Sequence, residues 1–171
     1  MDQPKLDRSR SEIPEASLRV DLPLSSLAAT HALGRRLAAL IRPGDVITLS
    51  GALGVGKTEL ARALIRARAG AEIEVPSPSY TLVQDYRFPE LAIRHIDLYR
   101  VEDAAELVEL DLDAPAADEA WLIEWPERVE GILPAERLKL ELRQGAAPDA
   151  RIVRLIGSLS WSDRLSGLRR R

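Results

Sequence analysis

Eight consecutive residues have the types and the spacing of a phosphate-binding loop. Residues 51–58 read Gly-Ala-Leu-Gly-Val-Gly-Lys-Thr. Glycines let successive backbone N–H groups turn toward a phosphate chain, and a helix that follows adds its positive N-terminal end. In such a loop Lys57 bridges the terminal phosphates, and the Thr58 hydroxyl is a ligand of Mg²⁺. The sequence therefore predicts a site for a nucleoside triphosphate.

The residues on either side of this loop agree with the prediction. The apolar run 46–50 has the composition of a buried strand, and residues 57–68 predict a helix that ends before Gly70. Strand, glycine-rich loop and helix in this order form the P-loop unit. The alternative is a glycine-rich turn with an ordinary surface lysine. It is the less favoured interpretation, because the whole chain has only three lysines.

Two carboxylates follow predicted strands further along the chain. Alternation places His95, Asp97 and Tyr99 on one face of the first strand, and a carboxylate at its end could orient a water or a metal-bound water. For Asp97 alone, a helix cap or a salt bridge is the favoured alternative. The second strand, 120–124, ends in Glu124 as a Walker B strand ends in its acid. With the P-loop present, a metal role for Glu124 through a metal-bound water is favoured over an ordinary strand end.

The segment 75–83 combines two prolines with several hydroxyl groups. Its prolines hold the backbone extended, and its hydroxyls suit a switch that orders around a terminal phosphate and its metal. A plain turn before a strand is an equally good interpretation. Both remain open at the level of sequence.

The remaining patterns predict one α/β domain. Residues 1–17 predict a flexible lead-in, 18–157 a single P-loop domain, and 158–171 a polar, basic tail. Expected elements are a strand at 18–22 ended by Pro23, a helix from Ser25 or Ser26 to about Ile41, a hairpin over 82–96, a helix capped by Asp103, and strands at 138–142 and 152–156. His31 is interpreted as a surface histidine rather than a ligand.

Composition limits the class of protein. The chain has 171 residues, a net charge of −3, no cysteine and no apolar run that could span a bilayer. These features favour a cytoplasmic protein with no membrane or DNA partner. Residues 101–127 contain ten carboxylates and no Lys or Arg, which would repel an RNA backbone and suit a basic protein partner. A solvated acidic face is the favoured alternative for this stretch.

Four motifs in order, LSGALGVGKT, SPSYTLV, HIDLYR and LIEWPERVEGILP, resemble those of the TsaE (YjeE) family of small bacterial P-loop ATPases. The resemblance covers about residues 22–142. It implies an α/β P-loop domain of three layers, with a mostly parallel central sheet and antiparallel additions, that binds ATP and Mg²⁺. It also implies action with the TsaB–TsaD protein complex in threonylcarbamoyl modification of the adenosine next to the tRNA anticodon, with tRNA engaged indirectly.

The family's site residues carry over position by position. Asp97 is implied to position the water or the metal, Trp125 to lie in the nucleotide pocket or on a partner surface, and Thr30 to lie near the base. Ser79 replaces the threonine of the family's Ser-Pro-Thr segment, a departure that keeps the hydroxyl and loses a methyl group. The metal is placed at Thr58 and Glu124, and the nucleotide along the loop residues Gly51, Leu53, Gly54, Val55, Gly56, Lys57 and Thr58.

Catalysis is expected from Lys57, Asp97 and Glu124 by positioning and charge neutralisation. No arginine near the loop is an obvious arginine finger, that is, a side chain that would stabilise the charge of the transition state. Arg100, in the HIDLYR motif, is the nearest candidate. Slow hydrolysis by the chain alone, accelerated by the partner complex, is therefore expected. Two other readings remain: a P-loop kinase for a small molecule, and an interaction module whose output is nucleotide binding rather than hydrolysis.

Overall fold

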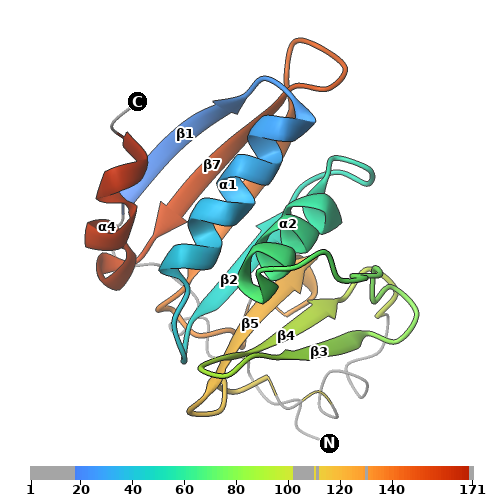
Figure 1. The fold of residues 1–171 in the computed structure, drawn as a ribbon, viewed down its shortest axis with the longest axis vertical. Helices are drawn as coiled ribbons and strands as arrows, with labels where there is room; N and C mark the ends of the chain where they lie inside the picture. Colours follow the sequence, from blue (N-terminus) through green and yellow to red (C-terminus); the bar gives the residue numbers. More distant parts are fainter. Residues whose placement is uncertain (1–17, 102–109, 111, 130, 170–171) are drawn as a thin grey trace, which may run out of the picture.

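The computed structural model describes residues 18–101, 110, 112–129 and 131–169 (Figure 1). Seven strands form one sheet in the order β1-β7-β6-β2-β5-β4-β3. Their bounds are β1 Leu18–Leu24, β2 Val46–Ser50, β3 Val83–Arg87, β4 Ala92–Asp97, β5 Glu119–Glu124, β6 Leu138–Gln144 and β7 Arg151–Gly157. The helices are α1 Leu27–Leu40, α2 Lys57–Ala69 and α4 Leu159–Leu165, with short 3-10 turns η2 Pro126–Arg128 and η3 Ser166–Arg169.

The centre of the sheet is parallel and its margins are antiparallel. Strand β2 pairs in parallel with β5 on one side and β6 on the other, and β4 pairs in parallel with β5. The pairs β1–β7, β6–β7 and β3–β4 are antiparallel. The predicted α/β class, with its mostly parallel centre and antiparallel additions, is confirmed. This order puts the carboxyl ends of β2, β4 and β5 side by side, where ligands of open α/β sheets bind.

Helices α1 and α2 lie side by side across one face of the sheet (Figure 1). Helix α1 begins at Ser26, whose hydroxyl accepts a hydrogen bond from the backbone N–H of Ala29, as a helix cap does. Helix α2 ends at Gly70, which has φ of 64° and donates its N–H to the carbonyls of Arg66 and Ala67. Such a left-handed end favours glycine, so both predicted helix boundaries are confirmed.

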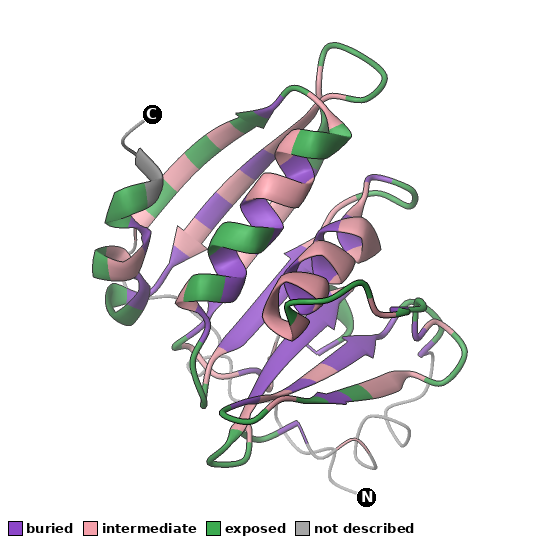
Figure 2. Cartoon of the chain, in the orientation of Figure 1, coloured by how far each residue is buried: buried purple, intermediate pink, exposed green. Residues whose placement is uncertain are grey.

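Two apolar clusters hold the layers together. The larger lies between the sheet and the helices and includes Leu37, Ile47, Leu64 and Leu122. The smaller, on the opposite face, includes Val46, Ile96 and Trp121 of β2, β4 and β5 and the loop residues Val101, Leu112, Val129 and Leu133. Figure 2 shows the resulting burial of β2 and β5 along their length. Strand β5 ends in the buried carboxylate of Glu124, and β2 leads into the loop that precedes Lys57.

Two predicted features of the chain are wrong. Pro23 does not end the first strand but pairs with Ile152 inside β1, which proline tolerates because β1 is an edge strand. The region after Gly157 is not a polar tail along its length, because residues 159–165 form α4 with Trp161 and Leu165 buried against the sheet. The helix expected after Asp103 and most of the acidic stretch around it lie outside the described residues.

None of the helices in the described ranges combines the length and the apolar character needed to cross a bilayer.

Candidate nucleotide site

The loop between β2 and α2 has the backbone of a phosphate cradle. Gly51, Gly54 and Gly56 have φ values of 132°, 74° and 108°. These lie in the region that side chains disfavour. At Gly51 space is also limiting, because a Cβ atom there would lie 2.3 Å from the carbonyl oxygen of Leu142. The loop therefore needs glycine at these positions, and it delivers the N-terminus of α2 to the pocket.

Lys57 lies almost entirely inside this loop. Its side chain is 5% exposed, and Nζ donates to the carbonyl oxygens of Gly51 at 2.7 Å and Ala52 at 3.0 Å. Burial lowers the pKa of the Lys57 ammonium below its ordinary value, and the nearby carboxylates of Glu124, Glu127 and Asp97 oppose that shift. The Lys57 side chain is therefore largely shielded from water, where an ammonium attracts phosphate more strongly than it does at an exposed surface.

Thr58 and Glu124 meet at the carboxyl ends of the parallel strands. The Thr58 hydroxyl donates to Oε2 of Glu124 at 2.8 Å, and Glu124 is only 1% exposed. The two residues are 66 positions apart and are brought together by the parallel pairing of β2 with β5. The predicted pair of metal residues is therefore adjacent in space.

Asp97 ends β4 and is held by the segment that follows α2. Its Oδ2 accepts hydrogen bonds from Ser79 Oγ at 2.7 Å and from Ser77 Oγ at 3.2 Å, and its Oδ1 accepts the backbone N–H of Tyr99 at 3.0 Å. Asp97 is 2% exposed. The serine segment, which the sequence left open between a switch and a turn, is thus tied to the pocket through this carboxylate.

Trp125 follows Glu124 in a left-handed backbone conformation, with φ of 59° and ψ of 51°. For a bulky residue this conformation is strained, and such strain gathers at functional sites. Its ring lies 3.7 Å from Lys57 Nζ and packs on Tyr99 with ring centroids 5.0 Å apart. Trp125 therefore covers the lysine and forms one wall of the pocket.

The structure brings most of the predicted site residues to one pocket. Thirteen residues line it, namely Leu53, Gly54, Gly56, Lys57, Thr58, Glu59, Arg62, Ser77, Ser79, Asp97, Tyr99, Glu124 and Trp125. Gly51 and Val55 line a neighbouring depression with Leu142, Arg143 and Gln144. Thr30 lines neither depression; it is buried in α1 with its hydroxyl 3.5 Å from the carbonyl oxygen of Ser26.

Sequence reasoning missed three charged neighbours of the loop. Glu59 and Arg62 of α2 line the pocket and bond to one another, and Arg62 Nε also donates to the carbonyl of Val75 at 3.0 Å. Arg151 of β7 donates through Nε to the carbonyl of Val55 at 2.7 Å. Arg62 lies four residues after Thr58 on the same helix, which places it near the loop, but nothing in the sequence predicts the reach of Arg151.

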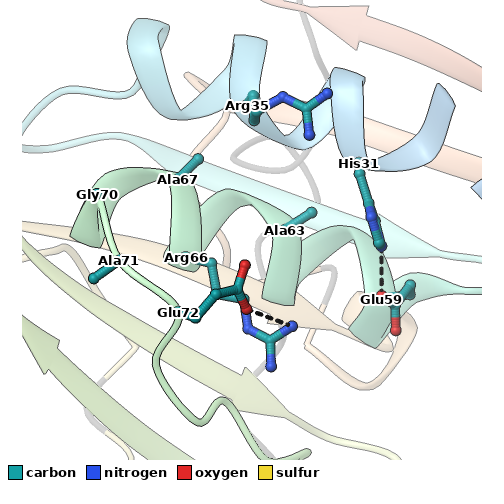
Figure 3. Close-up of a pocket in the computed structure, with 9 residues that line it drawn as sticks. All are labelled: His31, Arg35, Glu59, Ala63, Arg66, Ala67, Gly70, Ala71 and Glu72. Carbon is teal, nitrogen blue, oxygen red and sulfur yellow. Dashed lines mark hydrogen bonds and ion pairs between the residues drawn. The ribbon is translucent and has the colours of Figure 1, made fainter. Parts of the chain in front are cut away.

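A second cavity lies between α1 and α2 and is lined by charged side chains (Figure 3). Figure 3 shows His31 pointing from α1 to Glu59, with Nε2 2.7 Å from Oε1, and Arg66 paired with Glu72. His31 is thus half-buried and hydrogen-bonded to Glu59 between the two helices. His31 and Arg66 of this cavity are engaged by Glu59 and Glu72, whereas the P-loop pocket adds a glycine-rich backbone cradle and the N-terminus of α2.

The donor set of the P-loop pocket fits Mg²⁺ and a nucleotide. A threonine hydroxyl and a carboxylate are hard oxygen donors, and Mg²⁺ in phosphoryl-transfer sites takes one or two such ligands together with phosphate oxygens and water. The described residues contain no group of three or more His, Asp or Glu side chains arranged to hold a metal alone. These donors therefore suit an Mg²⁺ ion that also binds the phosphates of the nucleotide. Lys57 and the N-terminus of α2 would bind the same phosphates.

Comparisons with known proteins agree with this geometry. The family model described as "Threonylcarbamoyl adenosine biosynthesis protein TsaE" matches residues 24–153. The chain is 34% identical to the tRNA threonylcarbamoyladenosine biosynthesis protein TsaE of Rickettsia bellii, over 70% of this chain and 83% of the relative. It is 37% identical to that of Streptomyces coelicolor, over 71% and 84%. A crystal structure of Bacillus subtilis YdiB matches with a TM-score of 0.69 at 25% identity, over 91% of this chain and 96% of that one. The chain belongs to the TsaE family.

Proposed function

We propose that the chain binds ATP with Mg²⁺ and hydrolyses it in support of threonylcarbamoyl modification of the adenosine next to the tRNA anticodon. Its relatives are named for the biosynthesis of this nucleoside. We further propose that it acts in the cytoplasm with the TsaB–TsaD pair, and that tRNA is engaged through that pair. The net charge of −3 supports an indirect contact with RNA.

One observation carries the proposal: the hydrogen bond between Thr58 and Glu124 beside a buried Lys57. A P-loop lysine alone would suffice for phosphate binding. A hydroxyl directed by a buried acid at the end of the neighbouring strand adds the oxygen donors that hydrolysis requires near the terminal phosphate. Mg²⁺, when bound, would neutralise charge on the phosphate oxygens.

The chain's own residues would then act in three ways. Lys57 and the loop N–H groups bind and orient the phosphates, and they stabilise the negative charge that develops on them. Asp97, held at both oxygens, orients the attacking water. Trp125 and Tyr99 exclude solvent from the lysine.

The arginines near the pocket support slow hydrolysis by the isolated chain. Arg62 lines the pocket, but it is engaged by Glu59 and by the carbonyl of Val75. Arg100 is exposed and lies over the ring of Tyr80, with Cζ 4.0 Å from the ring centroid. A positive charge supplied in trans, as a partner can supply an arginine finger, would therefore accelerate the reaction.

The test is ATP hydrolysis by the purified chain with Mg²⁺, alone, with TsaB–TsaD, and with tRNA added. The proposal expects a low basal rate that rises several-fold with the pair. A basal rate of tens per second, typical of an efficient phosphoryl-transfer enzyme, would contradict the need for a partner. Transfer of labelled phosphate to a small acceptor instead of water would point to the kinase reading.

A nucleotide-dependent interaction module is the second candidate, and one observation favours it. Asp97 is occupied by Ser77, Ser79 and the backbone of Tyr99, which is also how a purely structural loop anchor would look. Asp97→Asn keeps the size of the side chain, removes its charge and replaces one of its two acceptor oxygens with an NH₂ donor. Loss of hydrolysis with ATP binding retained would support catalysis, whereas unchanged hydrolysis would remove Asp97 from the mechanism. Loss of hydrolysis with full support of the modification would favour the module.

A further inference from the structure

His95 is a buried polar residue that the proposed mechanism does not use. It lies on β4, is 0% exposed, and its Nε2 lies 2.9 Å from Oε1 of Glu124. An ionised carboxylate can only accept hydrogen bonds, so the ring donates through Nε2. The other ring nitrogen, Nδ1, has no hydrogen-bond partner within the described part of the chain. Glu124 is therefore the contact that accounts for a histidine at this position.

The register of the sheet explains the contact. Strands β4 and β5 run in parallel with His95 opposite Leu122 and Asp97 opposite Glu124. Residues two apart on a strand share a face, so His95, Asp97 and Glu124 all lie on the same side of the sheet. His95 is not part of the pocket lining but contacts Glu124, whereas Asp97 and Glu124 both line the pocket.

Each of the two oxygens of Glu124 has its own hydrogen-bond donor. His95 donates to Oε1, and the Thr58 hydroxyl donates to Oε2. A hydroxyl has one hydrogen and two lone pairs, so once its hydrogen is directed at Glu124 its lone pairs are available to a cation. If the carboxylate turned, the hydroxyl would lose its acceptor. By holding Oε1, His95 therefore fixes the orientation of the Glu124 carboxylate, and with it the direction of the Thr58 hydroxyl.

We infer that His95 is a positioning residue for the Mg²⁺ shared with the nucleotide, because it holds Glu124 in the orientation that presents the Thr58 oxygen to the ion. The inference rests on the proposed function. Hydrogen-bond partners behind metal ligands commonly change metal affinity by about 10- to 100-fold when removed. Packing does not require a histidine here, since Ile93, two residues earlier on the same face, is apolar and equally buried.

The test measures how much Mg²⁺ tightens nucleotide binding, without reference to turnover. The dissociation constant of a fluorescent ADP analogue is measured with EDTA and with saturating Mg²⁺, and the ratio of the two is the Mg²⁺-dependent gain. His95→Gln places an amide donor near the position of Nε2, whereas the shorter His95→Asn does not reach Glu124. We expect the gain to fall about tenfold in H95N and to be largely kept in H95Q, with the affinity in EDTA unchanged in both.

Ile93→Val is the matched control, because it alters the same strand and face without touching Glu124. It should lower the temperature of unfolding and leave the gain as in the wild type. If H95N does not fold, His95→Leu takes its place with the same expected loss. Equal gains in the Gln variant and the non-donating variant would overturn the role of His95. A wild-type protein with no Mg²⁺-dependent gain would overturn the proposed function itself.

Discussion

A charged cluster largely shielded from solvent lies at each end of strand β2, and the two clusters are built in opposite ways. At the amino end, Asp45 accepts hydrogen bonds from Arg164 at 2.6 and 2.9 Å, and Arg164 also donates to the carbonyl of Leu40 and lies over the ring of Trp161. At the carboxyl end, Lys57 is bonded to backbone carbonyls of its own loop. The first cluster joins three segments of the chain, and the second faces a pocket.

The comparison separates stability from function along one strand. Asp45 and Arg164 of the amino-end cluster are partners of one another, so removing one should affect folding and leave the pocket unchanged. At the carboxyl end, burial of Lys57 lowers the stability of the folded protein. Its role in binding phosphate explains why a lysine is found there. Substitutions at the two ends should therefore change different measurements.

The largest expected effect is on stability, from Trp161→Ala at the amino-end cluster. Trp161 is 1% exposed and packs between α4 and the sheet. Truncating a buried tryptophan lowers the free energy of unfolding by about 3–5 kcal/mol. Denaturant unfolding measures this loss, and nucleotide affinity below the unfolding transition should not change. Leu159→Ala in the same helix removes an exposed side chain and serves as the control. A loss below that of the control would contradict the docking of α4.

The converse substitution is Lys57→Ala at the carboxyl end. Removing a group that stabilises transition-state charge lowers rates by about 100- to 1,000-fold, and ATP hydrolysis should fall by that amount. The free energy of unfolding should not fall, because burial of the ammonium lowers its pKa and opposes folding in the charged form. Lys139→Ala, on β6 and away from the pocket lining, is the control. A Lys57→Ala variant that still hydrolysed ATP at the wild-type rate would contradict a functional role for the cluster at the carboxyl end.

Local patterns in the sequence predicted the carboxyl end well and the amino end poorly. The P-loop, β2, α2 and the strand that ends in Glu124 each have a pattern within a few neighbouring residues, which is why they could be predicted. The docking of Trp161 depends on a surface made by distant segments, and three terminal arginines favoured a solvated tail instead. A partly buried ion pair between residues 119 positions apart, such as that of Arg164 with Asp45, has no local signature in the sequence.

The site itself shows the same limit. Asp97 and Glu124 were predicted from strand ends, but their neighbours follow from sheet register. The contact of His95 with Glu124 requires β4 beside β5 in one particular alignment, and the contact of Arg151 with Val55 joins residues 96 positions apart. Residue type suggests a charged site, whereas pairing between strands decides which charges meet.

A smaller effect on stability is expected at the ion pair of the amino end. Arg164→Ala leaves Asp45 without its bidentate partner, and hydrogen bonds to charged groups contribute about 1.5–3 kcal/mol. Asp45→Asn and the double variant complete a cycle in denaturant unfolding. The two single effects should not add, since both remove one interaction. Additive losses would show that Arg164 acts through its contact with Trp161 instead.

At the carboxyl end, a comparable small effect is expected from Ser79→Ala. Ser79 donates to Asp97 at 2.7 Å, and Ser77 does so at 3.2 Å. Loss of one hydrogen bond of about 0.5–1.5 kcal/mol corresponds to a two- to tenfold lower rate of ATP hydrolysis if Asp97 becomes less well held. Ser77→Ala is the matched variant and should have the smaller effect. The reverse ranking would show that the longer contact is the one that matters.

The smallest effect is expected at a second Asp–Arg pair, which has the same chemistry as Asp45 and Arg164 but lies at the surface. Asp21 and Arg154 form an Asp–Arg pair with distances of 2.8 and 3.0 Å, but both side chains are well exposed. The hydrogen bond and charge of Arg154 lower the pKa of Asp21. A folded-state pKa below the unfolded one stabilises the protein above the unfolded value, and this contribution disappears as pH falls through the folded value.

Asp21→Asn should therefore be slightly less stable than the wild type at neutral pH and equal to it in strong acid. Thermal unfolding from about pH 7 down to about pH 2 at low salt measures the difference, and added salt should shrink it because the pair is exposed. Asp45→Asn should show a larger loss that salt affects less, since Arg164 and Asp45 are shielded from solvent. If salt reduced both losses equally, burial would not distinguish the two pairs, and the amino-end cluster would be an ordinary surface contact.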